Sequence, residues 1–187
     1  MKKKLCVLLP GVGYTTDKPL MYYSGKMLKN EGYDLIFIQY ANLPTNIKDD
    51  KDKKENAFLI ALEQTKNQLS EVNWNEYESI VFVGKSIGTI IAAAYGCDMP
   101  EVEAEVKYIY LTPLQQTFDY AKNASGIAFH GTSDPWVETE TVEKGCKDKN
   151  IPLFKYENAN HSLETGNVPV DIEYLSDVME KIREYLF

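Results

Sequence analysis

Six short apolar runs, each separated from the next by an amphipathic stretch, constrain the fold of this 187-residue chain more than any other feature. The runs are rich in β-branched and aromatic residues and are bounded by turn-forming residues, which is typical of buried strands. They cover residues 5–9, 34–40, 79–83, 106–111, 126–130 and 152–157. We therefore expect about six strands whose two faces are both covered.

The stretches between these runs have the apolar spacing of helices. They cover residues 19–30, 54–69, 87–95, 138–147 and 171–185. Apolar strands that alternate with helices indicate a mostly parallel sheet with helices on both faces, which is the α/β class. No repeat, low-complexity tract or linker divides the chain, so we expect a single domain over residues 1–187.

Composition excludes several classes of function. The formal net charge is −8, whereas nucleic-acid binding needs clustered Lys and Arg. No run approaches the roughly 18 apolar residues of a membrane helix. Cys6, Cys97 and Cys146 are widely spaced and form neither a metal-binding pattern nor a disulfide framework. We expect a cytoplasmic protein without a metal or an organic cofactor.

A glycine-bounded serine follows the third apolar run. Gly84-Lys85-Ser86-Ile87-Gly88 leaves a predicted strand and enters an apolar helix, the setting in which a G-x-S-x-G motif presents a nucleophile. A side chain at Gly84 or Gly88 would collide with the neighbouring strand or helix. The alternative is a plain turn in which Ser86 caps the helix. Lys85 is expected to pack or to face solvent.

A serine nucleophile needs a base, and the chain has only two histidines. His161 lies in a polar turn after the last predicted strand, and Asp134 lies in a turn after the preceding one. The order Ser86, Asp134, His161 is the one found in α/β hydrolases. Asp119 is a weaker alternative acid, and we expect His130 to hold the Asp134 turn by a hydrogen bond.

Three segments, GKSIG, HGTSDPWV and ANHSLE, resemble motifs of the α/β hydrolases, especially small, capless, dienelactone-hydrolase-like serine hydrolases. The resemblance extends along essentially the whole chain. It implies a minimal α/β-hydrolase fold without a cap, with Ser86 as nucleophile, Asp134 as acid and His161 as base. Dienelactone hydrolases themselves use a cysteine nucleophile, so their substrate does not transfer to this chain.

The tetrahedral intermediate of acyl transfer needs two N–H donors. We expect them from the backbone of Ile87, directly after the nucleophile, and of Val12, in the loop after the first strand. Pro10 stands where many relatives have a histidine. A phosphate-binding loop is disfavoured, because position 16 is Thr16 where G-x-G-x-x-G has its third glycine.

These observations predict a serine hydrolase that cleaves small carboxylic esters or thioesters through an acyl-enzyme, with Tyr14 and Trp136 as candidate pocket residues. Amide substrates remain open, as does a non-catalytic hydrolase fold that binds a ligand or a partner. The expected partner is a small-molecule substrate rather than a nucleic acid or a membrane, and the sequence leaves the oligomeric state open.

Two segments bear on substrate size. Residues 112–125 are too few for a cap, which favours acyl groups of about two to six carbons by the burial expected per methylene. Residues 41–56 carry a run of charges that is typical of a solvated loop. The alternative is that this loop forms a mobile rim over the site.

Overall fold

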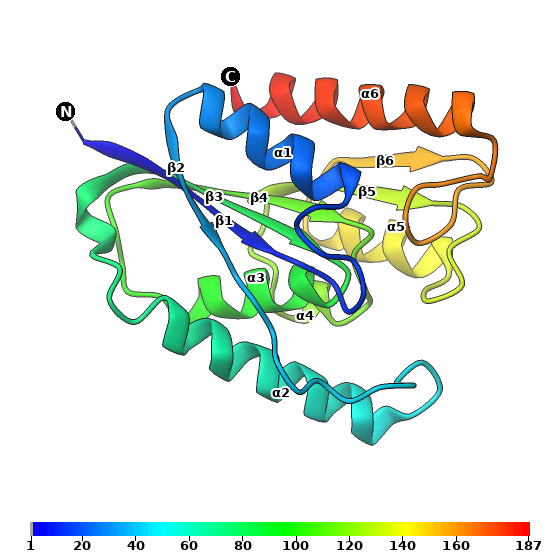
Figure 1. The fold of residues 1–187 in the computed structure, drawn as a ribbon, viewed down its shortest axis with the longest axis horizontal. Helices are drawn as coiled ribbons and strands as arrows, with labels where there is room; N and C mark the ends of the chain where they lie inside the picture. The colour runs from blue at the N-terminus through cyan, green and yellow to red at the C-terminus, as the bar shows by residue number, and fades with distance from the viewer. Residues whose placement is uncertain (1) are drawn as a thin grey trace.

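The protein is described by a computed structural model that covers residues 2–187 and is built around one six-stranded sheet (Figure 1). Its strands are β1 (Lys3–Leu9), β2 (Tyr33–Phe37), β3 (Tyr77–Lys85), β4 (Glu105–Leu111), β5 (Gly126–Gly131) and β6 (Leu153–Tyr156). The strand order is β2-β1-β3-β4-β5-β6, and every neighbouring pair is parallel. The predicted α/β class is confirmed, and the sheet is wholly parallel.

Helices cover both faces of this sheet (Figure 1). On one face lie α1 (Pro19–Asn30) and α6 (Val168–Leu186). On the other lie α2 (Lys51–Gln68), α3 (Ile87–Asp98), α4 (Thr117–Tyr120) and α5 (Thr139–Asp148). A short 3-10 turn, Trp74–Glu76, precedes β3.

The two faces of β3 show why its sequence is continuously apolar. Phe82 packs with the α2 and α3 layer, whereas Val81 and Val83 pack with the α1 and α6 layer, and all three side chains are fully buried. Successive strand residues point to opposite faces, so a strand covered on both sides needs apolar residues at every position.

The segment after β2 departs from the predicted pattern. The strand ends at Phe37 rather than at residue 40. The Ile38 N–H still donates to the Leu8 carbonyl of β1 at 2.9 Å, and beyond it two side-chain amides of α2 pair with the chain. Gln64 Oε1 accepts from the Ala41 N–H and its Nε2 donates to the Ala41 carbonyl, both at 2.8 Å. Gln68 does the same with Gln39, at 3.0 and 2.8 Å.

The predicted loop over residues 41–56 is partly helical. Helix α2 begins at Lys51, and Asp50 caps it by accepting the Lys53 N–H at 3.0 Å. The predicted start of this helix, at residue 54, is wrong. A run of charges is typical of a solvated loop, but Asp50 is also a typical N-cap.

Only α4 and its flanking turns connect β4 to β5, so no cap domain occurs within residues 2–187. None of the helices in this described range is long and apolar enough to cross a membrane.

Candidate active site

Ser86 occupies the sharp turn between β3 and α3. Its φ is 56° and its ψ is −120°, a conformation that residues other than glycine rarely adopt. Its N–H donates to the Leu111 carbonyl at 3.0 Å, and its own carbonyl accepts from the N–H and the hydroxyl of Thr89. Strained backbone of this kind persists where the surrounding structure holds it, often at functional sites.

The two glycines of the motif permit this turn. A Cβ on Gly84 would lie 2.5 Å from the carbonyl oxygen of Gly88. A Cβ on Gly88 would overlap the carbonyl oxygen of Leu9 on β1. The predicted collisions are therefore confirmed, and both involve backbone atoms that cannot rotate away.

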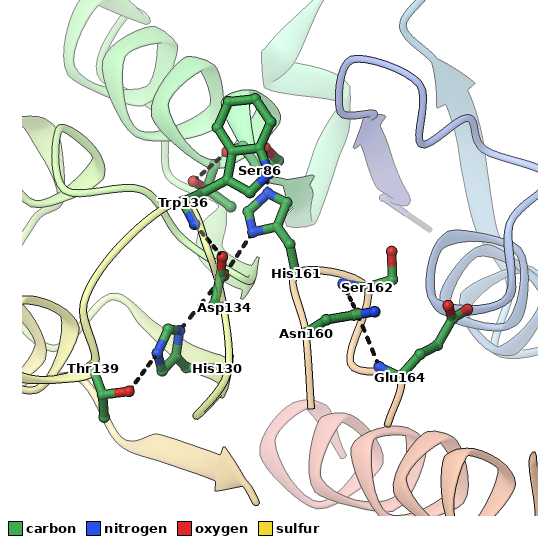
Figure 2. A network of polar contacts seen from close by, with 10 residues as sticks. Ser86, His130, Asp134, Trp136, Thr139, Asn160, His161, Ser162 and Glu164 are labelled. Atoms are coloured by element: carbon green, nitrogen blue, oxygen red, sulfur yellow. Dashed lines mark hydrogen bonds and ion pairs between the residues drawn. The ribbon is translucent and has the colours of Figure 1, made fainter. Parts of the chain in front are cut away.

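Three loops bring Ser86, His161 and Asp134 into one hydrogen-bonded chain (Figure 2). His161 Nε2 lies 2.7 Å from Ser86 Oγ, and His161 Nδ1 lies 2.6 Å from Asp134 Oδ2. The second carboxylate oxygen of Asp134 accepts the Trp136 N–H at 2.8 Å. With a carboxylate at Asp134, Nδ1 carries the imidazole hydrogen, and the lone pair of Nε2 faces the serine hydroxyl.

Hydrogen bonds within and between the loops fix the imidazole. Asn160 Oδ1 accepts the N–H groups of Ser162 at 2.7 Å and Glu164 at 3.2 Å, which shapes the turn that carries His161. The Ser133 N–H donates to the Ala159 carbonyl at 2.9 Å and ties the loop that carries Asp134 to the loop that carries His161. The Asp134 side chain is fully buried, and that of His161 is 16% exposed.

His130 does not make the predicted hydrogen bond to the Asp134 turn. Its Nε2 pairs with Thr139 Oγ1 at 3.0 Å, whereas its Nδ1 lies 3.9 Å from Asp134 Oδ2, beyond hydrogen-bonding distance (Figure 2). Asp119, the alternative acid, lies on α4 at the wall of the cleft described below. Within residues 2–187 no hydrogen bond or ion pair joins Asp119 to His161.

The backbone N–H groups of Val12 and Ile87 are the candidate oxyanion donors. Both residues line the same cleft as Ser86. Across the described part of the chain, neither N–H donates to a protein acceptor. Gly11 allows the close approach of the Val12 loop, because a Cβ there would already lie 3.2 Å from Ser86 Cβ.

A cleft of about 1210 Å³ opens over Ser86 and His161. Tyr14 and Trp136, the two predicted pocket residues, both contribute to its wall. The Trp136 ring lies 5.6 Å from the His161 ring, and the side chain is 36% exposed. No group of His, Cys, Asp and Glu side chains that could hold a metal ion occurs among residues 2–187.

Helix α2 and the turn before it form a wall of this cleft that the sequence interpretation only partly anticipated. Ile47, Phe58 and Leu59 line it together with Lys48, Lys51 and Lys54. Phe58 stacks on Tyr120 of α4 with ring centroids 5.7 Å apart. Part of residues 41–56, from Ile47 to Glu55, therefore lies at the cleft. That the segment forms a mobile rim stays a prediction.

The charge of His161 is disfavoured in this setting. Burial lowers the pKa of His161 below its ordinary value of 6.5, against the opposing effect of the hydrogen bond to Asp134. The positive charge of Lys85 lowers the same pKa further. A lowered pKa favours the neutral form of the His161 imidazole.

Comparison of the sequence with models of protein families gives no match, and comparison with curated proteins gives none either. Solved structures are similar in fold. A protein of unknown function from Agrobacterium tumefaciens, described as a candidate α/β hydrolase, has a TM-score of 0.65 at 16% identity and covers 98% of this chain and 86% of its own.

Two further similar structures belong to proteins described as hydrolases. A serine hydrolase without a lid from Xanthomonas campestris gives a TM-score of 0.61 at 13% identity, over 100% of this chain and 84% of its own. An esterase from Pyrococcus furiosus has a TM-score of 0.62 at 15% sequence identity, and the match covers 98% of this chain and 83% of the esterase. On this evidence the chain has the α/β-hydrolase fold.

Proposed function

We propose that this protein is a serine hydrolase that cleaves carboxylic esters or thioesters through an acyl-enzyme. The observation that carries the proposal is the continuous hydrogen-bonded chain from Ser86 Oγ through His161 to Asp134. Ser86 attacks the carbonyl carbon while His161 Nε2 takes the hydroxyl proton, and Asp134 stabilises the imidazolium that results.

The remaining steps use the same groups. The N–H groups of Val12 and Ile87 bind the oxyanion, and His161 returns its proton to the leaving alcohol or thiol. Water then enters in place of the leaving group, gives a proton to His161 and attacks the acyl carbonyl carbon. The bond between Ser86 Oγ and the acyl group breaks, the carboxylic acid departs, and His161 returns the proton to Ser86 Oγ. The leaving group must lie on the His161 side of Ser86, where Trp136 borders the cleft.

The proposal extends to the domain organisation, the location and the partner of the protein. We propose a single domain over residues 1–187, a cytoplasmic setting and a small-molecule substrate as the partner. The dienelactone-hydrolase-like subtype remains a prediction from the motifs.

Covalent labelling of the protein tests the proposal directly. A fluorophosphonate probe reacts with a serine that a base has activated, so mass spectrometry should find one adduct, on the peptide that contains Ser86. The Ser86→Ala variant should carry none. No adduct on a protein shown to be folded would instead favour a non-catalytic ligand-binding or interaction module. Hydrolysis of amides in preference to esters and thioesters would instead indicate an amide substrate.

The pH dependence of kcat/KM reports the state of His161 in the free enzyme. Because the base must be neutral, activity should be complete above the pKa of His161 and be lost below it. Burial lowers that pKa from 6.5, so the acid limb should lie below pH 6.5. Circular dichroism at each pH excludes unfolding as the cause of the loss. An acid limb at or above pH 7 would contradict the assignment.

Acyl-chain length should matter more than the absence of a cap suggests. The α2 wall and the start of α3 provide apolar surface, including Phe58, Ile87 and Ile90. Each fully buried methylene adds about 0.8 kcal/mol, and an open cleft buries only part of it. We therefore expect kcat/KM for nitrophenyl esters to rise about twofold per carbon up to roughly eight carbons and then to level off. The Phe58→Ala variant should give a shallower rise, and a decline after six carbons would favour the prediction of short acyl groups of about two to six carbons.

A further inference from the structure

Lys85 is a buried lysine beside Ser86, and the proposed reaction makes no use of its charge. It is the last residue of β3, and only 1% of it is exposed. By the alternation of the strand it shares a face with Val81 and Val83, which pack toward α1 and α6. Lysine normally keeps its ammonium group in water even when its stem is buried, so this burial requires an explanation.

An aromatic ring lies close to the Lys85 ammonium. Lys85 Nζ lies 4.8 Å from the centroid of the Tyr14 ring, and the Leu20 N–H donates to the Tyr14 hydroxyl at 3.2 Å. The face of a tyrosine attracts a cation but replaces only part of its hydration. Within residues 2–187 the Lys85 ammonium forms no hydrogen bond and no ion pair.

The charges that face Lys85 are at a distance or already engaged. They are Asp134, which follows β5, and His161 and Glu164, which follow β6. Both Asp134 oxygens accept other hydrogen bonds, and Glu164 is exposed. Burial lowers the pKa of Lys85 to about 7, against the opposing effect of the two carboxylates. A desolvated amine that titrates near neutrality lacks a strong acceptor.

We propose that Lys85 is a specificity residue that binds an anionic group, a carboxylate, on the substrate. Lys85 and Tyr14 line the same cleft as Ser86, so a substrate bound at the nucleophile has its second group within their reach. The inference rests on the proposed hydrolase function. Pairing also removes an electrostatic penalty, because an unpaired Lys85 cation opposes formation of the His161 imidazolium during attack.

Two matched ester pairs test this proposal. In the first, nitrophenyl hexanoate is compared with nitrophenyl hydrogen adipate, so that a terminal methyl is replaced by a carboxylate on the acyl side. In the second, the hexanoate ester of phenol is compared with that of 4-hydroxybenzoate, which places the carboxylate on the leaving group. Below pH 7 the wild type should favour the charged ester in one of the two pairs. That pair shows whether Lys85 binds a carboxylate on the acyl group or on the leaving group.

Substitutions at Lys85 should change this preference. A charge-assisted hydrogen bond corresponds to about a 10- to 100-fold effect, so Lys85→Met should lower the charged-to-neutral ratio of kcat/KM by that factor. The Lys107→Met variant is the matched control. It removes a lysine that lies 5.6 Å from the ring centroid of Tyr185, and residue 107 does not line the cleft, so its ratio should equal that of the wild type.

The pH dependence separates recognition from a structural role. The Lys85 charge is present below a pKa of about 7 and is lost above it, so the wild-type preference should decline as the pH rises through that value. Arginine stays protonated over this range. The Lys85→Arg variant should therefore keep its preference at pH 9, and this arm remains informative if Lys85→Met does not fold.

Equal kcat/KM for both members of both pairs below pH 7, or a ratio that Lys85→Met does not change, would overturn the inference. The proposed function would survive either result, provided that the fluorophosphonate probe still labels Ser86. Failure of the wild type to hydrolyse any of the esters or to be labelled would remove the function and the inference together.

Discussion

The His161→Ala variant should lower kcat by about 10⁵- to 10⁶-fold, by analogy with other serine hydrolases from which the base was removed. Without Nε2 at 2.7 Å from Ser86 Oγ, no group takes the hydroxyl proton as the serine attacks. The oxyanion donors remain, so a residual rate above that of water is expected. Steady-state hydrolysis of a nitrophenyl ester measures the loss, and the labelling rate with fluorophosphonate should fall in parallel.

The His130→Ala variant is the matched control, since it also removes a buried imidazole near Asp134. His130 pairs with Thr139 and stands 3.9 Å from the carboxylate, outside the chain of hydrogen bonds that ends at Ser86. Its loss leaves a cavity, so the variant should have a lower free energy of unfolding. Its kcat should change much less than that of His161→Ala. Comparable losses of kcat in both variants, each shown to be folded, would contradict the proposed roles.

Much of the architecture could be predicted because parallel strands buried on both faces leave a strong pattern. Helix α1 begins and ends at the predicted residues 19 and 30, where Pro19 is tolerated in a first turn and Gly32 follows the last one. The boundary of α2 could not be found in the same way. The start of α2 is highly charged, and the pairing of Gln64 and Gln68 with the chain after β2 is a tertiary contact that local sequence does not encode.

The grouping of Ser86, Asp134 and His161 could be predicted because parallel strands all end at one edge of the sheet. Each residue follows a different strand, so topology alone brings the three loops together. Two parts of the site carry no such signal. The burial of Lys85 depends on Tyr14 from another loop, and the contribution of Phe58 to the cleft depends on its contact with Tyr120 of α4.

The predicted hydrogen bond between His130 and the Asp134 turn is wrong for a related reason. Its place four residues before Asp134 puts the two side chains close together, yet the start of α5 supplies a nearer partner in Thr139. Sequence spacing predicts such proximity but does not determine which of two nearby groups is better oriented.

The Gly88→Ala variant should lose about 4 kcal/mol of stability, at the upper end of single substitutions. Its Cβ would overlap the Leu9 carbonyl oxygen and lie 2.7 Å from the Leu9 carbonyl carbon and 2.8 Å from the Pro10 oxygen. All three are backbone atoms of β1 and the loop after it, so relief requires α3 to move away from the centre of the sheet.

For a chain of this size, that loss corresponds to a fall in Tm of about 8–16 °C. The Gly32→Ala variant is the control, because Gly32 also lacks a Cβ but meets nothing within 4 Å and has only its φ of +84° to strain. It should lose about 1 kcal/mol, or roughly 2–4 °C. Thermal unfolding of both variants measures the difference. Because the displaced segment leads to Val12, Gly88→Ala should also reduce kcat at temperatures where it is folded, whereas equal Tm values for the two variants would mean that α3 moves away from β1 with little loss of stability.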